Sequence, residues 1–184
     1  MERSQLNDIL QLALIEILGE KQTLDLLNQD VSSSITIPNL HEQLIKMYGR
    51  SSSKGIEHRI GEACFRHFIK RMGFEMGFFQ SAFKLYPIKK KILTGFNTMS
   101  EIYGSHFDDR IQFTDTGAIY QLKVGNDLSP VEKTVYNGCD MMTGFIKEFM
   151  AWVGNSKVYE VNENECRRNG YRYCIFNIGK VPLD

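Results

Sequence analysis

The chain has 184 residues, and its 22 Lys and Arg balance its 22 Asp and Glu, so the formal net charge is zero. This balance argues against a nucleic-acid-binding protein, because such proteins carry a basic excess. The sequence shows no secretory signal and no apolar run long enough to span a membrane, so we expect a cytoplasmic protein with reduced thiols. Its length fits a single domain over residues 1–184.

Residues 1–105 are expected to be mostly helical, because apolar residues recur there at helical spacing. Gly19 and Gly49 are expected to end helices, and Ser51-Ser52-Ser53 is expected to form a loop. Helices are predicted at residues 4–18, 23–27, 38–48, 55–72, 78–86 and 88–103.

Two polar groups in this helical part have a simple structural interpretation. Cys64 and His67 lie three residues apart and can face one metal ion, but the neighbouring sequence offers no further ligands. Both are therefore expected to belong to the core. The run Lys89-Lys90-Lys91 is expected to form a solvated helix face and not an anion-binding site.

Residues 106–184 begin with a predicted β-hairpin. Apolar and polar residues alternate at 111–114 and at 118–124, with a turn at Thr116-Gly117, which indicates a hairpin with one apolar face. Ser129-Pro130 is then expected to begin a long helix.

That long helix is expected to contain Cys139 on its buried side and to end at Gly154. Two further strands are predicted at 157–162 and 173–178. The fold class is therefore expected to be α+β, with an antiparallel sheet of four to five strands covered by helices.

The C-terminal hairpin carries two cysteines. Cys166 and Cys174 flank Asn169-Gly170, a strong turn signal. A two-residue turn would pair Cys166 with Tyr173 and place the thiols on opposite faces. A three-residue loop centred on Gly170 would instead pair Cys166 with Cys174 and bring the thiols together.

Cys139 followed by the pattern Glu163-x2-Cys166-x7-Cys174 and Ile-Phe-Asn-Ile resembles the C-terminal zinc motif of the 4-vinyl reductase domain family. The motif covers roughly the last fifty residues, and a looser likeness at Tyr48-Gly49 and at 55–68 extends over most of the chain. That family includes phenol-sensing input domains and hydrocarbon-binding proteins, and it shares its fold with TRAPP transport-particle subunits.

The resemblance implies a structural Zn²⁺ ion held by Cys139, Glu163, Cys166 and Cys174. Three thiolates and one carboxylate are suitable tetrahedral ligands and leave no open position for substrate water. Glu163 would face away from Cys166 on a regular strand, so a bulge or a strand end must intervene. Without the family pattern, buried free cysteines remain the alternative.

An apolar ligand is suggested by the 12 Phe, 8 Tyr and 8 Met of the chain, because such residues line pockets as well as irregular cores. The apolar face of the first hairpin must pack against the stretch before it and the helix after it. The side chains expected to share this space are Phe96, Met99, Phe113, Tyr120, Tyr136, Met142 and Phe149. They either interdigitate as an ordinary core or enclose a ligand.

We expect a binding module, a sensor or carrier of a small hydrophobic or aromatic molecule, and not an enzyme. No nucleotide-binding or metalloprotease motif is present, and His106, Asp108 and Asp109 are interpreted as polar loop residues. The alternatives are a tetrapyrrole-binding accessory of vinyl reduction in chlorophyll-type pigment synthesis, as the family name suggests, and a dimeric scaffold without a ligand.

The resemblance also implies a homodimer, because members of this fold commonly pair. The residues support this in one respect, since Leu12 and Ile15 extend the apolar surface of the first helix beyond a single stripe. The chain ends at Asp184, shortly after the last predicted strand, so a signal is expected to pass to a separate protein.

Overall fold

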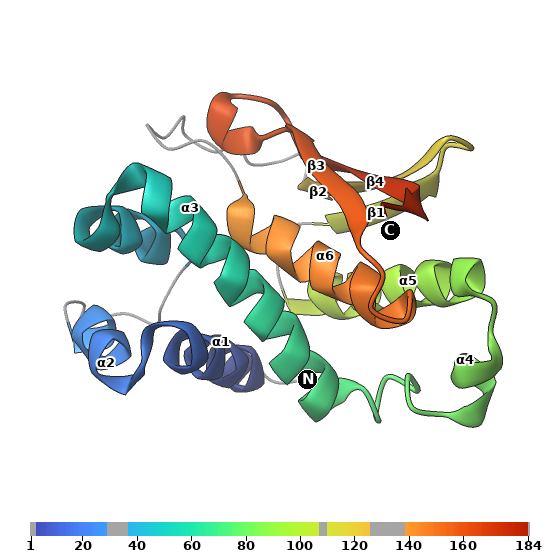
Figure 1. Cartoon of the computed structure of the whole chain (residues 1–184), viewed down its shortest axis with the longest axis horizontal. Helices are drawn as coiled ribbons and strands as arrows, with labels where there is room; N and C mark the ends of the chain where they lie inside the picture. Colours follow the sequence, from blue (N-terminus) through green and yellow to red (C-terminus); the bar gives the residue numbers. More distant parts are fainter. Residues whose placement is uncertain (1–2, 29–36, 107–109, 126–138, 184) are drawn as a thin grey trace. The chain divides into compact units, whose positions relative to one another are not determined.

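The computed structural model describes residues 3–28, 37–106, 110–125 and 139–183. It is a mixed α+β structure, as predicted, whose described part holds six α-helices and one four-stranded antiparallel sheet (Figure 1). The α-carbon contacts divide the chain into two compact units. The first unit comprises residues 1–71 and 140–145, and the second comprises residues 72–139 and 146–184.

The first unit is helical. Helix α1 spans Arg3–Leu18, α2 spans Glu20–Asn28 and α3 spans Ile37–Met72, and the first residues of α6 (Asp140–Val153) complete the unit. Gly19 ends α1 with a positive φ of 86°, the conformation expected of a C-terminal glycine.

Gly49 has the backbone angles φ 77° and ψ 163°, which interrupt α3 at the predicted position. The loop predicted at Ser51–Ser53 is wrong, because the helix resumes immediately after the glycine. Ser53 is fully buried, and its hydroxyl donates to the carbonyl oxygen of Arg50 at 3.0 Å, so a serine hydroxyl satisfies a backbone acceptor at the start of the resumed helix.

Helices α3 and α6 approach each other closely at two glycines. A Cβ atom on Gly144 would lie 2.8 Å from the carbonyl carbon of His58, and one on Gly61 would lie 2.8 Å from that of Met141. Next to this contact, the ring of Phe145 packs edge-on against Phe65, with centroids 5.3 Å apart. The backbones of α3 and α6 are therefore in close contact at Gly61 and Gly144, where glycine leaves room for the other helix.

Ion pairs join α1 to α3 on the surface of this unit. Glu16 accepts from Arg66 at 2.6 Å and lies 2.8 Å from Nε2 of His67, and Asp8 pairs with Arg71 at 3.0 Å. Pairs of this exposure contribute little individually, so the buried apolar faces of the helices supply most of the stability.

The second unit contains the sheet. Its strands are β1 (Arg110–Asp115), β2 (Ile119–Gly125), β3 (Tyr159–Glu165) and β4 (Cys174–Pro182), in the order β1-β2-β4-β3. Helix α4 (Ser81–Leu85) is shorter than the helix predicted at 78–86, and α5 (Ile88–His106) follows it.

One face of the sheet is apolar and the other is polar, as the alternation predicts. Tyr120, Leu122 and Val124 of β2 are buried, and on β4 Phe176 and Ile178 are fully buried. Figure 1 shows α5 and the later part of α6 along one side of the sheet. None of the helices in the described part of the chain has the length and apolar character needed to cross a bilayer.

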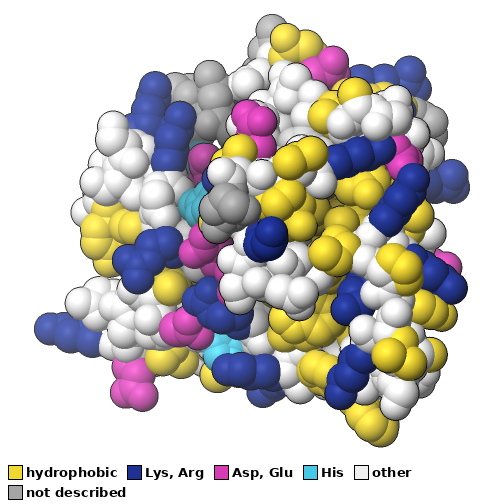
Figure 2. Space-filling model, turned by 45° about the vertical axis from the view of Figure 1, so that its right-hand side comes forward, with side chains coloured by type: hydrophobic (Ala, Val, Ile, Leu, Met, Phe, Trp, Pro, Cys, Tyr) yellow, Lys and Arg dark blue, Asp and Glu magenta, His cyan; other side chains and the backbone are white. Residues whose placement is uncertain are grey.

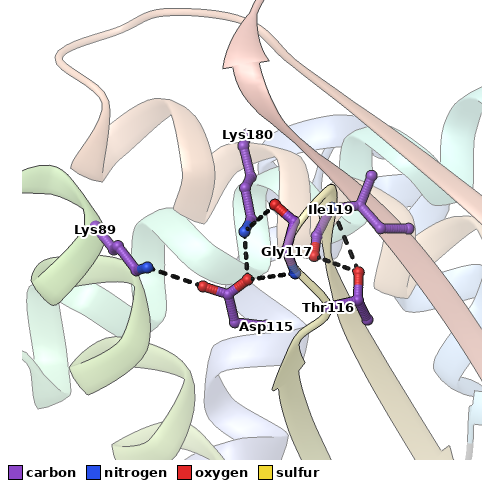
Figure 3. Close-up of polar contacts among 6 residues, drawn as sticks. All are labelled: Lys89, Asp115, Thr116, Gly117, Ile119 and Lys180. Atoms are coloured by element: carbon purple, nitrogen blue, oxygen red, sulfur yellow. Dashed lines mark hydrogen bonds and ion pairs between the residues drawn. The ribbon is translucent and has the colours of Figure 1, made fainter.

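The tip of the first hairpin is tied to its neighbours by Asp115 (Figure 3). Its carboxylate accepts from Nζ of Lys180 on β4 and from the backbone N–H of Gly117 at 2.9 Å, and it pairs with Lys89 at the start of α5 at 3.0 Å. Lys180 also donates to the carbonyl oxygen of Gly117 at 2.8 Å. The carboxylate thus links a helix, a turn and a strand.

Asp115→Asn is expected to lower stability in a pH-dependent way. The hydrogen bond from Lys180, followed by those from Gly117 and Lys89, lowers the pKa of Asp115. Because the pKa of Asp115 is lower in the folded state, the ionised carboxylate stabilises the fold above the unfolded-state pKa of about 4. This contribution is lost as the pH falls below that value. Urea midpoints should therefore differ between wild type and variant at pH 7, and the difference should shrink below about pH 4. An equal difference at pH 7 and pH 3 would refute this role.

Candidate metal centre and aromatic cluster

Four side chains of the second unit converge on one point. Cys139 precedes α6, Glu163 lies on β3, Cys166 follows β3 directly and Cys174 begins β4. Their ligating atoms, three sulfurs and a carboxylate oxygen, all lie within 4.8 Å of one another. The four residues named by the sequence motif are therefore together in space and can hold a metal ion.

The predicted bulge that turns Glu163 toward the thiols is present in β3. Glu163 pairs with Phe176 but Glu165 pairs with Ile175, so the register shifts by one residue between these pairs. A bulge adds one residue to one strand and re-aims the side chains beside it. Glu163 can therefore share a site with Cys166, although the two are three residues apart.

The connection between β3 and β4 is longer than either turn considered from the sequence. A 3₁₀ turn at Arg167–Asn169 follows Cys166, and both Asn169 and Tyr171 donate to the carbonyl oxygen of Cys166. Gly170 has a φ of 90°, the left-handed conformation expected of it. The three-residue loop was wrong, but its consequence was right, because Cys166 and Cys174 lie at the two ends of this connection.

Cys139 is not inside a helix, which corrects the prediction of one continuous helix from Ser129-Pro130. Its backbone angles, φ −111° and ψ 56°, are those of the residue before α6. Its N–H donates to Oε2 of Glu163 at 2.8 Å, which holds this backbone near the other three ligands. The predicted start of the helix, at 129–138, lies outside the described residues.

The three thiols form a hydrogen-bonded group. The sulfur of Cys139 lies 3.8 Å from that of Cys166 and 3.5 Å from that of Cys174. Hydrogen bonds from Cys139, then from Cys166, and one from the N–H of Arg167 lower the pKa of Cys174 to about 4. Donation to its neighbours correspondingly raises the pKa of Cys139. At least one thiolate is therefore ready to bind a cation at neutral pH.

Glu163 also fits a metal ligand. Burial is the main reason that its pKa rises to about 7. Its Oε2 accepts from Cys139, whereas its Oε1 is buried and forms no hydrogen bond with the described residues. A buried carboxylate oxygen without a donor costs free energy, and a bound cation would compensate for it.

Positive charge is available beside the cluster. Arg167 is only 8% exposed, and its backbone N–H lies 3.5 Å from the sulfur of Cys174. Arg168 and Arg172 belong to the same connection. These arginines can offset the excess negative charge of three thiolates and a carboxylate around a dication.

Four of the seven residues predicted to line a ligand space form an aromatic cluster in the same unit. The ring of Phe96 on α5 lies 4.6 Å from that of Phe113 on β1 and 4.6 Å from that of Phe149 on α6. The Phe113 ring is 5.4 Å from that of Tyr120. Met99 is buried on the same helix as Phe96. Within this aromatic cluster the rings contact one another directly.

Two predicted ligand residues are not part of the aromatic cluster as described. Met142 is half-buried in the first unit, and Tyr136 lies outside the described residues. Asp108 and Asp109 and the side chain of His106 also lie outside them.

Gly95 was missed by sequence reasoning. A Cβ atom there would lie 2.5 Å from Cζ of Phe149, so the glycine makes room for the ring. A glycine inside a helical pattern is the signal that could have identified it.

Cys64 belongs to the core of the first unit, as expected, but His67 does not, because it is only half-buried and pairs with a carboxylate at the surface. Burial raises the pKa of the Cys64 thiol to about 12, and His67 pairs with Glu16. Within the described ranges, the cluster around Cys139 is the only group of three or more potential metal ligands.

No family model and no curated protein matches the chain. Solved structures do resemble it. An H-NOX protein from S. oneidensis in the Fe(II)NO ligation state has a TM-score of 0.64 at 10% identity, covering 96% of this chain and 98% of that one. The phenol-responsive sensory domain of the transcription activator PoxR, solved with phenol, has a TM-score of 0.50 at 15% identity, covering 78% and 71%.

A vinyl-4-reductase family protein from Methanocaldococcus jannaschii has a TM-score of 0.44 at 14% identity, covering 93% of each chain. This likeness is weaker than the other two, and membership of that family stays a prediction. What the comparisons establish is the fold, which this chain shares over nearly its whole length with an H-NOX protein and in large part with a phenol sensor domain.

Proposed function

We propose that the Cys139, Glu163, Cys166 and Cys174 cluster binds a structural Zn²⁺ ion. Zn–S bonds are about 2.3 Å long, so two ligands of a tetrahedral zinc lie about 3.8 Å apart. The Cys139 sulfur lies 3.8 Å and 3.5 Å from its two neighbours, close to that spacing and far from the roughly 2.05 Å of a disulfide. The buried Oε1 of Glu163 is the observation that most favours a cation.

The zinc would stabilise the fold and not catalyse a reaction. Four protein ligands fill a tetrahedral site, so no position remains for substrate water. The ion would instead fasten Cys139 to the β3–β4 connection. Three thiolates favour zinc over the hard cations Ca²⁺ and Mg²⁺.

We propose further that the chain is a sensor or carrier that binds a small hydrophobic or aromatic molecule. The likeness to a sensory domain solved with phenol, over 78% of this chain, is the observation that carries this proposal. The aromatic cluster of Phe96, Phe113, Tyr120 and Phe149 offers suitable walls, since aromatic rings favour offset or edge-on contact with a second ring.

The ligand would enter the aromatic cluster at Phe113. This residue is half-buried on β1, which is an edge strand of the sheet, whereas Phe96 and Phe149 beneath it are buried. A rotation of the Phe113 ring would open the aromatic cluster at its outer side, and a phenol-sized ring could then pack against Phe96.

Two alternatives remain, each with its own support. The H-NOX protein in its Fe(II)NO state carries iron, and haem is one group that holds iron in proteins, which favours a tetrapyrrole ligand. The direct contacts among the rings of the aromatic cluster favour the third possibility, a homodimeric scaffold without a ligand. Leu12 and Ile15 are half-buried on α1 and remain our candidate dimer contacts.

Phe113→Trp is expected to abolish binding of phenol, toluene and indole while costing less than about 1.5 kcal/mol of stability. The larger ring would occupy the space that a ligand needs at the edge of the sheet. Thermal-shift titration of wild type and variant with these compounds, and with haemin, checks both effects.

The matched control is Thr114→Trp, which adds the same ring to the exposed face of the same strand. It should leave ligand binding unchanged. If Phe113→Trp unfolds the protein and the wild type binds none of the compounds, the aromatic cluster is a packed core and the scaffold interpretation stands.

A further inference from the structure

The turn between α4 and α5 presents apolar side chains to solvent. We define the α4–α5 corner as residues 84–91. Leu85 is 84% exposed and Ile88 is 40% exposed, although both are large aliphatic residues. Phe74 and Phe79, also exposed, lie in the segment leading into α4. Scattered exposed apolar residues are ordinary, but four in fifteen residues form a concentration that needs an explanation.

The α4–α5 corner is held firmly from its inner side. Phe83 is buried, and its ring lies 4.9 Å from that of Phe78 and 5.9 Å from that of Trp152 on α6. The two exposed side chains therefore project from an anchored turn and are not the result of a loose segment.

The charge of the α4–α5 corner is one-sided. Four lysines, at positions 84, 89, 90 and 91, occur between Glu75 and Glu101, and no Asp or Glu lies between those two residues. Nζ of Lys90 lies 3.8 Å from the centre of the Tyr86 ring, and Lys89 shares Asp115 with Lys180. Figure 2 turns this side of the molecule forward and shows hydrophobic side chains interspersed with Lys and Arg.

We propose that the α4–α5 corner docks on the surface of an anionic lipid bilayer. Leu85 and Ile88 would enter the boundary between headgroups and acyl chains. Lys84, Lys90 and Lys91 would lie at the level of the lipid phosphates, which revises the sequence-based expectation that residues 89–91 bind no anion, while Lys89 stays paired with Asp115. Apolar side chains flanked by basic ones are the pattern of peripheral membrane attachment. The long aliphatic stems of the lysines would lie along the same apolar layer.

A protein partner fits this surface less well. A stable protein interface buries roughly 1,200–2,000 Å² around a continuous apolar centre. The α4–α5 corner has two aliphatic tips with lysines on both sides of them, at a sharp turn of the chain. A bilayer accepts such a surface because it deforms around individual side chains.

The test is co-sedimentation of the full chain with vesicles. We expect binding to phosphatidylcholine vesicles that contain about one-third phosphatidylglycerol, and binding at least about tenfold weaker to phosphatidylcholine alone. Raising the salt from 50 mM to 500 mM should weaken the anionic binding, because it screens the lysines.

Two variants separate the contribution of the apolar side chains to vesicle binding from that of the lysines. Leu85→Ser is expected to weaken binding by about tenfold, because one exposed leucine no longer enters the bilayer. Lys84→Glu combined with Lys90→Glu should weaken it by at least about tenfold through charge reversal. Leu24→Ser is the control, since Leu24 is 54% exposed on α2 in the other unit and should leave binding unchanged.

Three outcomes would overturn the proposal. The first is no sedimentation of the wild type with anionic vesicles, and the second is equal binding by the wild type and both corner variants. The third is a dimer in analytical ultracentrifugation that Leu85→Ser converts to a monomer while vesicle binding is absent, which would assign the α4–α5 corner to a second copy of the chain. None of these outcomes depends on whether the aromatic cluster binds a ligand.

Discussion

Cys166→Ser is expected to remove the bound zinc and to lower the free energy of unfolding by about 3 kcal/mol or more. Cys166 follows β3 directly, and its sulfur lies 3.8 Å from that of Cys139. Loss of this ligand would detach the β3–β4 connection from Cys139. Because the site would have to assemble on folding, metal-binding free energy contributes to folding free energy.

The measurement pairs metal analysis with urea unfolding of protein purified without added zinc. We expect about one zinc per chain in the wild type and none in Cys166→Ser. The control is Cys64→Ser, which alters a buried thiol of the first unit and should leave the zinc content unchanged. A metal-free wild type that is as stable as the same protein with zinc would contradict the proposed site.

Gly144→Ala is expected to be among the most damaging single-methyl changes in the chain. The new Cβ atom would lie 2.8 Å from the carbonyl carbon of His58 and closer still to its oxygen. These are backbone atoms of α3, so the clash can be relieved only by moving one helix. A loss of at least about 3 kcal/mol is expected, beyond the usual range for overpacking a core.

Gly55→Ala, on α3, provides the matched control, because it also adds one methyl group inside a helix. A Cβ atom at Gly55 has no neighbour within 4 Å, so the change should stabilise α3 by about 0.5–1 kcal/mol through helix propensity. Thermal unfolding of the two variants should therefore shift in opposite directions. A Gly144→Ala protein as stable as the wild type would show that α3 and α6 do not meet at these glycines.

Local patterns predicted the elements whose cause is local. The alternation around Thr116-Gly117 gave both strands of the first hairpin, and Gly19 and Gly49 marked breaks in the helices because each takes a positive φ. The sequence also required a bulge or a strand end near Glu163, since no regular strand could bring that residue and Cys166 to one site, and the structure has the bulge. In each case the local spacing of residues along a helix or strand decides which side chains share a face.

Predictions failed where burial, or a partner far along the chain, decides the conformation. Ser51–Ser53 looks like a loop, but a buried serine hydroxyl that bonds the Arg50 carbonyl allows a helix to resume there. Cys139 continues a helical apolar stripe, yet its N–H bonds the carboxylate of Glu163, 24 residues further along the chain. The burial of Ser53 and the pairing of Cys139 with Glu163 both depend on residues outside the local pattern.

The glycine contact between α3 and α6 was likewise invisible in the sequence. Gly61 and Gly144 each stand inside a helical pattern, where a glycine costs stability unless something approaches the backbone. This cost marks each glycine as unusual, but it does not identify the atoms that approach it. Only the structure shows that Gly61 faces Met141 and that Gly144 faces His58.

The most direct test of small-molecule binding is an NMR titration of zinc-loaded protein labelled with ¹³C at the methionine methyl groups. Met99 and Met150 are buried in the unit that holds the aromatic cluster, whereas Met47 is exposed in the other unit. We predict that phenol or a related aromatic shifts the Met99 and Met150 signals saturably, through ring currents, and leaves Met47 unchanged. Signals that stay fixed with phenol, toluene, indole and haemin up to millimolar concentration would contradict the proposal that the chain is a ligand-binding module.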